Sequence, residues 1–152
     1  MKKLVQTALV ALGLSVAMAC QAAETPEPGQ RMSPEQLAQW GQLRSYTAGS
    51  SRLRVLPVPP ADGEGVLLLS SQDVVGLSRN EVLVVGASED QVRAAASVPA
   101  PVSVQYMAPT GSALLRYAEF GQAVAALKAL KTNLPGATVR LPVQWEKTPV
   151  PR

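Results

Sequence analysis

Histidine is absent from this chain of 152 residues. Imidazole is the side chain whose unperturbed pKa lies closest to neutral pH, so its absence removes the usual general base. It also excludes Ser-His-Asp and Cys-His activation of a nucleophile, and zinc or copper sites with histidine ligands. We therefore expect a protein that is not an enzyme and that uses no metal or other cofactor.

Close pairs of carboxylates, which could still supply acid–base chemistry, are scarce. Glu89-Asp90 is the only adjacent acidic pair, and Asp62 with Glu64 is the only close-spaced one. The first pair falls where a helix is expected to begin, and negative charge there complements the helix dipole. The second lies in an Asp-Gly-Glu-Gly sequence that is typical of a turn. Both pairs are expected to be structural, and a glycine-rich phosphate loop is also absent.

Long apolar runs are missing except at the N-terminus. Lys2 and Lys3 precede an apolar run from Leu4 to Ala19, which ends in Ala17-Met18-Ala19 with small residues at positions −3 and −1. This is the pattern of a secretory signal peptide. The alternative is a membrane anchor, but the run is shorter than the roughly 20 apolar residues that a span requires. We expect residues 1–19 to be removed during export.

Cysteine occurs once, at Cys20, so no disulfide can form within the chain. Ala17-Met18-Ala19-Cys20 resembles the lipobox of bacterial lipoproteins, in which the cysteine is lipidated and becomes the new N-terminus. That family prefers Leu at −3 and a small residue at −2, where this chain has Ala17 and Met18. Ordinary cleavage after Ala19, Ala22 or Ala23 is the alternative. The resemblance implies a lipid anchor at Cys20 as the only contact with a membrane.

Charge of one sign is not in excess once the signal segment is set aside. Without residues 1–19 the chain keeps 12 basic and 11 acidic side chains, a net charge of +1. The basic residues are scattered and the aromatic residues are few, so we expect no nucleic-acid partner. The remaining length of about 130 residues suffices for one small domain with a hydrophobic core.

Local signals divide the chain into a tether, one domain and a tail. Residues 20–31 are rich in Pro, Gly and polar residues and are predicted to be a flexible tether. Ser33, Pro34 and Gln36 form a capping-box pattern that predicts a helix, and strands are predicted at 52–58 and 66–69. The domain is expected to span residues 32–146, and residues 147–152 to be disordered.

Residues 82–145 predict an α+β fold of the order β-α-β-β-α-β. The apolar run at 82–85 is followed by a helix capped by Ser88, strands at 102–106 and 113–117, a helix from Phe120, and an alternating strand at 139–145. This is the order of the ferredoxin-like sandwich, to which the N-terminal helix and one or two extra strands would be added. One core is expected to bury a common set of side chains: Leu83, Val85, Val104, Leu115, Val124, Leu127 and Leu141.

Two segments of this region resemble the half-repeats of a known family. Leu83-Val84-Val85-Gly86 before one helix, and Leu115 to Phe120 before the next, resemble SPOR domains. These are small ferredoxin-like envelope domains that bind peptidoglycan strands lacking stem peptides. The resemblance implies a peptidoglycan partner, but the chain departs from the pattern at Ala118, where the second repeat usually has Gly. No binding residue is carried over.

Three classes of function fit these patterns. The first is a non-enzymatic binding or assembly module of the bacterial cell envelope, in the periplasm or anchored to the outer membrane and facing the periplasm; an accessory of a secretion, conjugation or pilus system would be one example. The second is an inhibitor or immunity-type protein of an envelope enzyme, and the third is an enzyme that uses carboxylates or a Ser/Lys pair. Binding needs an exposed sheet face with a few aromatic or Arg anchors. The candidates are Ser103, Gln105, Arg116, Arg140, Gln144, Trp40 and Trp145, and a merely solvated sheet face is the alternative for the polar ones.

Overall fold

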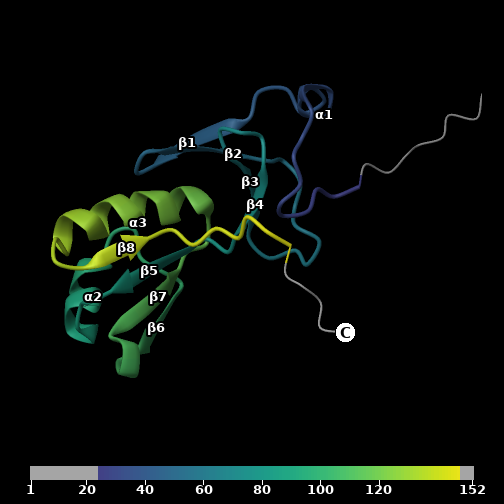
Figure 1. The fold of residues 1–152 in the computed structure, drawn as a ribbon. Coiled ribbons are helices and arrows are strands. Elements are labelled where there is room, and N and C mark those ends of the chain that lie inside the picture. The colour runs from purple at the N-terminus through teal and green to yellow at the C-terminus, as the bar shows by residue number, and fades with distance from the viewer. Residues whose placement is uncertain (1–23, 148–152) are drawn as a thin grey trace, which may run out of the picture.

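The computed structural model describes residues 24–147. They form a mixed α+β fold with two antiparallel four-stranded sheets and three α-helices, shown in Figure 1. Cys20 and the expected signal segment lie outside the described residues. In chain order the elements are α1 (Pro34–Ala38), β1 (Arg44–Ala48), β2 (Ser51–Val55), β3 (Val66–Leu69), β4 (Val75–Ser78), β5 (Glu81–Val85), α2 (Glu89–Ala95), β6 (Ser103–Met107), a 3₁₀ turn (Ala108–Thr110), β7 (Ser112–Arg116), α3 (Phe120–Asn133) and β8 (Thr138–Arg140).

The first sheet is a meander in the order β1-β2-β3-β4. Strand β3 confirms the prediction at 66–69, and β2 confirms the first part of the prediction at 52–58 but ends at Val55; β1 and β4 were not predicted. The sheet therefore has four strands where the sequence predicted one or two. β1 has the polar sequence Arg-Ser-Tyr-Thr-Ala, and β4 is only Val-Gly-Leu-Ser, so neither shows a sustained period of two.

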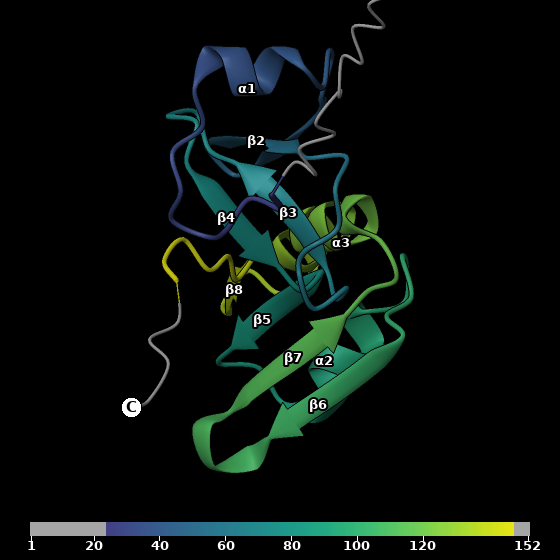
Figure 2. The same cartoon turned by 90° about the vertical axis from the view of Figure 1, so that its right-hand side faces the viewer.

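The second sheet has the order β6-β7-β5-β8, with every neighbouring pair antiparallel. The elements from β5 to β8 follow one another along the chain as predicted for residues 82–145. The apolar strand β5 is central, where both of its sides are paired. Strand β8, the last in the chain, lies at one edge of this sheet, and β6 lies at the other edge, as Figure 2 shows.

The predicted last strand over 139–145 is wrong in its second half. β8 ends at Arg140, and Pro142, which has no backbone N–H, follows two residues later. The chain then leaves the second sheet and reaches the first, where Gln144 and Leu77 of β4 exchange two backbone hydrogen bonds of 2.9 Å. This segment therefore connects the two sheets instead of extending one of them.

The predicted helix starts are confirmed. The Ser33 hydroxyl accepts a hydrogen bond from the Gln36 amide, and the Gln36 side chain accepts one from the Ser33 amide at 2.8 Å. Ser88 and Gln91 form the same reciprocal box at the start of α2. Each box satisfies two backbone donors that a helix start would otherwise leave unpaired.

Helix α3 lies between the two sheets (Figure 1). One side of the helix, with Leu127 and Leu130, packs on Val82, Val84 and Leu115 of the second sheet. Its other side presents Phe120 to the first sheet, where the ring meets Tyr46 edge-on at 5.4 Å between centroids. A further apolar cluster joins the opposite face of the first sheet to α1 and to Trp40. The resulting layers are α1, the first sheet, α3 with α2, and the second sheet.

The prediction that Leu83 and Val85 of β5 are buried in one common core is wrong. Val82 and Val84 are the buried residues of this strand, while Leu83 is half-buried and Val85 is exposed. Leu115 and Leu127 lie in the predicted core, but Val124 packs in the cluster between α3 and the first sheet. An apolar run of four residues contains no alternation, so the sequence could not identify which side faces the helices.

Part of the segment expected as a tether lies against the first sheet. Gly29 donates a backbone hydrogen bond to Val75, and Val75 donates one to Gln30, each of 2.8 Å. Pro26 is buried, and Glu27 pairs with Lys147 at 2.7 Å. Both ends of the described chain thus meet at the edge strand β4.

Candidate functional site

The face of the second sheet that points away from α2 and α3 is the candidate site. Residues in a strand alternate between the two faces, and the helix-facing set includes Val82, Val84 and Leu115. The intervening residues form the opposite face, which we call the open face. Its members are Glu81, Leu83, Val85, Ser103, Gln105, Met107, Ser112, Leu114, Arg116, Thr138 and Arg140.

Strand register builds a continuous row of side chains across the open face. Gln105 of β6 is opposite Leu114 of β7, and Leu114 is opposite Leu83 of β5. Leu83 is in turn opposite Arg140 of β8. The row therefore has two half-buried leucines in its centre and a polar side chain at each end. Directly opposite residues on one face have Cβ atoms about 4.5–5.5 Å apart, so these side chains can contact one ligand together.

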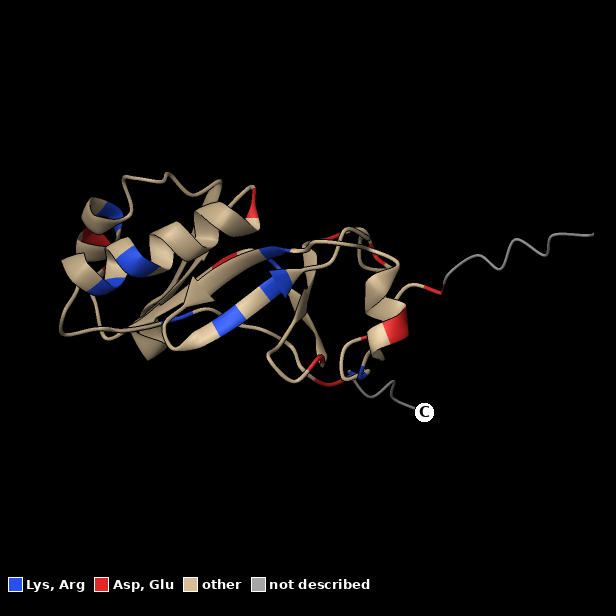
Figure 3. Cartoon of the chain, turned by 90° about the horizontal axis from the view of Figure 1, so that it is seen from above, with Lys and Arg blue, Asp and Glu red and all other residues tan. Residues whose placement is uncertain are grey.

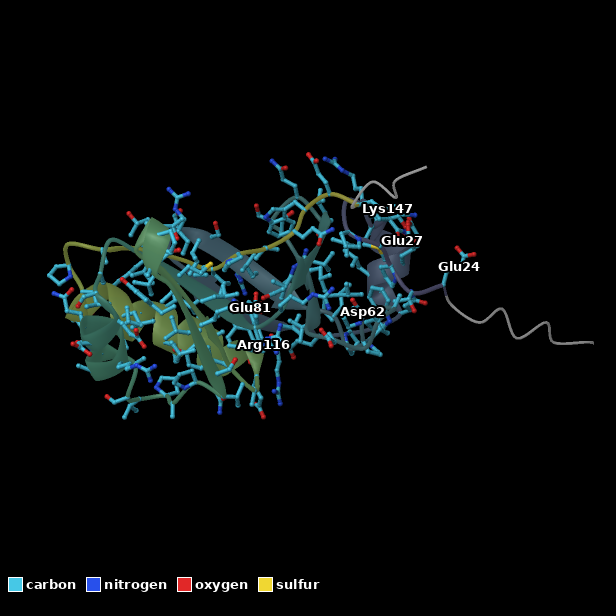
Figure 4. The ribbon with its side chains drawn as sticks, turned by 90° about the horizontal axis from the view of Figure 1, so that it is seen from below. Glu24, Glu27, Asp62, Glu81, Arg116 and Lys147 are labelled. Atoms are coloured by element: carbon cyan, nitrogen blue, oxygen red, sulfur yellow. The ribbon has the colours of Figure 1, made fainter. Side chains whose placement is uncertain are left out.

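A second row contains an ion pair. Arg116 is opposite both Ser103 and Glu81. Its guanidinium donates two hydrogen bonds, of 3.1 and 2.8 Å, to Oε1 of Glu81, and Figure 4 shows the two side chains together. The Glu81 side chain is only 14% exposed, so Arg116 holds a carboxylate that is mostly withdrawn from water.

Arg140 differs from Arg116 in its pairing. Within residues 24–147, Arg140 is exposed and belongs to no ion pair. An exposed guanidinium with five donors in a fixed fork can bind a carboxylate or another planar acceptor through two hydrogen bonds. Arg140 is therefore the cation of the open face that is available to an acidic partner.

Arg140 also links the open face to a neighbouring groove of about 330 Å³. The groove runs between α3, the β1–β2 turn and the segment after β8, and no acidic residue lines it. Its walls are mainly aliphatic, and its polar rim includes Lys131 and Arg140 with Trp145 beside them. The lining residues are Ala48, Ser51, Leu53, Leu127, Lys131, Val139, Arg140, Leu141, Val143 and Trp145.

The structure brings together only part of the predicted set. Ser103, Gln105, Arg116 and Arg140 share the open face. The other three predicted residues lie elsewhere. The backbone of Gln144 pairs with Leu77, and its side-chain amide donates to the Glu146 carbonyl at 2.9 Å. Trp40 packs against the α1 side of the first sheet, and Trp145 packs against the cluster beside Phe120.

Sequence reasoning missed the apolar centre of the open face. Leu83, Val85, Met107 and Leu114 are half-buried or exposed on a face expected to be polar. The available signal was the unbroken apolar run at 82–85. A strand that is apolar on both sides and covered on only one side must expose the other.

The acidic pairs have the structural roles expected of them. Glu89 lies in the first turn of α2 and pairs with Arg93 at 2.6 Å. Asp62 accepts from the Glu64 amide in the predicted turn, and the Arg79 guanidinium bound to Asp62 lowers the pKa of that carboxyl. Among residues 24–147, no three Asp, Glu, His or Cys side chains gather where they could hold a metal ion. Basic residues lie at several separate places on helices and strands, as Figure 3 shows.

Comparison with family models, with characterised proteins and with solved structures finds no significant match to this chain. In the part of the chain that the structure describes, no helix is both long enough and apolar enough to cross a bilayer.

Proposed function

We propose that this protein is an exported binding or assembly module of the bacterial cell envelope that docks a partner on the open face of its second sheet. The observation that carries the proposal is the row Gln105–Leu114–Leu83–Arg140. It combines an accessible apolar centre with a cation that has no ion-pair partner among the described residues. Apolar contacts surrounded by polar groups are the usual composition of a protein-binding surface.

The fold class that we propose for β5 to β8 is the ferredoxin-like sandwich. The strand order β6-β7-β5-β8, with α2 and α3 on one face, supports it. The sandwich leaves the other face of its sheet open, and in this chain that face carries the row described above. The first sheet and α1 then cover the outer side of α3, away from the proposed docking surface.

The chemistry that we propose for the partner follows from the side chains of the row. Two leucines favour an apolar group, and Arg140 favours a carboxylate beside it. An envelope protein with an acidic and apolar surface fits this description. A peptidoglycan strand is the alternative outcome, and binding to purified peptidoglycan sacculi distinguishes the two. The processed chain is expected in the periplasm, or at the outer membrane facing the periplasm if Cys20 carries lipid.

Photocrosslinking from the open face tests the proposal. A photoreactive residue in place of Leu114 should capture one defined envelope partner, whereas the same residue at the exposed Gln122 of α3 should not. Substituting Arg116 and Arg140 together should abolish the capture without changing the fold. Arg140→Ala alone should account for most of the loss, because Glu81 already engages Arg116.

Arg93→Ala is the matched control. Arg93 is also an exposed arginine paired with a glutamate, but it lies on α2, on the opposite side of the sheet. Capture by this variant should equal that by the wild-type chain. Unchanged capture by the Arg116/Arg140 variant, or a catalytic turnover that depends on a single carboxylate, would overturn the proposal.

A further inference from the structure

The four edges of the two sheets differ in how they are protected against pairing with another chain. Unpaired strand edges attract further strands, and proteins protect them with charges, prolines, very short strands or covering segments. β4 is covered by backbone hydrogen bonds from residues 29–31 and from Gln144. β1 begins with the exposed Arg44. β8 has three residues and is followed by Pro142.

β6 has prolines only outside its two ends, at Pro101 and Pro109, and among the described residues no charge or covering segment protects the strand itself. It has five residues, Ser-Val-Gln-Tyr-Met, without a charge or a proline. It pairs with β7 on one side and with no described strand on the other, and Figure 2 shows it as the outermost strand of its sheet. The segment just before it exposes two valines, Val98 at 77% and Val102 at 65%.

Two prolines lie at equal distances from Gln105 in the sequence around β6, and every residue between them is uncharged. Residues 101–109 read Pro-Val-Ser-Val-Gln-Tyr-Met-Ala-Pro. In an antiparallel pair of two such segments centred on Gln105, residues n and 210 − n are opposite each other. Val104 then meets Tyr106 and Ser103 meets Met107, while Pro101 and the 3₁₀ turn that begins at Ala108 lie outside the ladder. No charged side chain enters the pairing.

The register of the pairing gives a second reason for placing its centre at Gln105. Directly opposite residues of an antiparallel pair point to the same side of the sheet. Val104 and Tyr106 both point to the helix side, so pairing them keeps the helices of both copies on one side. A shift of one residue would place Val104 opposite Gln105 and break that agreement. A shift of two residues toward either end would move a proline closer to the pairing.

We propose that two copies of this chain associate through β6 to form one continuous eight-stranded sheet with a two-fold axis at Gln105. Such an interface is isologous, because the same residues serve both copies. It places the two open faces side by side. The proposal does not depend on the proposed docking function, since its test measures association of the chain with itself.

Sedimentation velocity of the chain after removal of its signal segment tests the proposal, under reducing conditions so that Cys20 cannot link two chains. The mass of the wild-type protein should rise with concentration to twice that of one chain. Gln105→Lys and Gln105→Glu should each stay monomeric, because two like charges would meet on the axis. An equimolar mixture of the two variants should recover the dimer.

Gln122→Lys is the control, because it adds the same charge at an exposed position of α3 and should leave the dimer unchanged. Far-ultraviolet circular dichroism should be the same for all these variants, and their midpoints of thermal unfolding should agree at concentrations low enough for the wild-type protein to be monomeric. A monomeric wild-type protein would contradict the proposal. So would a Gln105→Lys protein that still forms dimers, or a mixture that fails to recover them.

Discussion

Two buried side-chain atoms have no hydrogen-bond partner among the described residues: the hydroxyl oxygen of Tyr117 and the side-chain oxygen of Asn80. The two residues are joined through their backbones, since the Tyr117 amide donates to the Asn80 carbonyl at 2.9 Å. Tyr117 is 2% exposed, and burial raises the pKa of its hydroxyl to about 12. An unpaired buried hydroxyl costs about 1–3 kcal/mol of desolvation without a compensating bond.

Tyr117→Phe is therefore expected to leave the free energy of unfolding unchanged or to raise it. Tyr106→Phe is the contrasting variant, because the Tyr106 hydroxyl donates to the Ala87 carbonyl at 3.2 Å. Loss of this hydrogen bond should lower the free energy of unfolding by about 0.5–1.5 kcal/mol. Urea unfolding at neutral pH measures both differences. A clear destabilisation by Tyr117→Phe would show that the hydroxyl has a partner.

The raised pKa of Tyr117 also predicts a pH dependence. The unfolded tyrosine loses its proton near pH 10, and the folded one only near pH 12. The contribution of the Tyr117 hydroxyl to the free energy of unfolding is thus fully present below pH 10. It decreases between pH 10 and 12, by up to roughly 2–3 kcal/mol. Unfolding free energies measured across this range should fall less steeply for Tyr117→Phe than for the wild-type protein. An equal dependence of the unfolding free energy on pH in the two proteins would contradict the raised pKa of Tyr117.

Gly76 of β4 makes space for the segment that joins the two sheets. A Cβ atom at this position would lie 2.6 Å from the Trp145 ring and 2.7 Å from Cγ1 of Val143. Gly76→Ala should therefore destabilise the protein by about 1–3 kcal/mol, as overpacked cores do. Gly136→Ala is the control, because nothing lies within 4 Å of the added atom. Equal thermal midpoints for the two variants would show that Trp145 moves aside without cost.

At the scale of elements, α3 is the helix on which both sheets depend. Its buried residues include Phe120 toward the first sheet and Leu127 and Leu130 toward the second. The helix has the longest run of regular structure in the described chain, 14 residues. Packing on both sides supplies the stability that a helix of this length lacks when isolated.

Leu127→Ala should lower the free energy of unfolding by about 2–5 kcal/mol, because it removes a side chain that is 5% exposed and leaves a cavity against the second sheet. Lys128→Ala, at the next and exposed position, should change it by less than about 0.5 kcal/mol. Denaturant unfolding of both variants checks this. A loss below about 1 kcal/mol for Leu127→Ala would mean that the helix face is assigned wrongly.

Elements with a strong local signal were predictable from the sequence, and elements defined by tertiary contacts were not. The capping boxes at Ser33 and Ser88 are local, and both form as predicted. The second half of the last strand also has a clean alternation, yet it pairs with β4 because Leu77 offers it backbone partners. The open face was predictable as polar, but its apolar centre depends on which side of β5 the helices cover.

At the scale of the whole molecule, the two ends of the described chain meet beside the first sheet. Glu27 and Lys147 are paired beside β4, and Figure 4 shows them toward the end of the molecule where Glu24 begins the described chain. In Figure 2, α1 lies at the top of the molecule and β6 at the bottom.

The proposed envelope function depends on the prediction that the chain is exported. Intact-mass measurement on the envelope fraction should show a chain that lacks at least residues 1–19. An added diacyl or triacyl mass, lost in Cys20→Ser, would establish the lipid anchor, whereas a plain N-terminus at Cys20, Ala23 or Glu24 would indicate ordinary cleavage. Either product leaves the domain intact, because among the described residues Pro26 is the first that is buried and Glu27 is the first that forms an ion pair with the rest of the domain. A full-length chain in the cytoplasm would overturn both the export signal and the envelope function proposed from it.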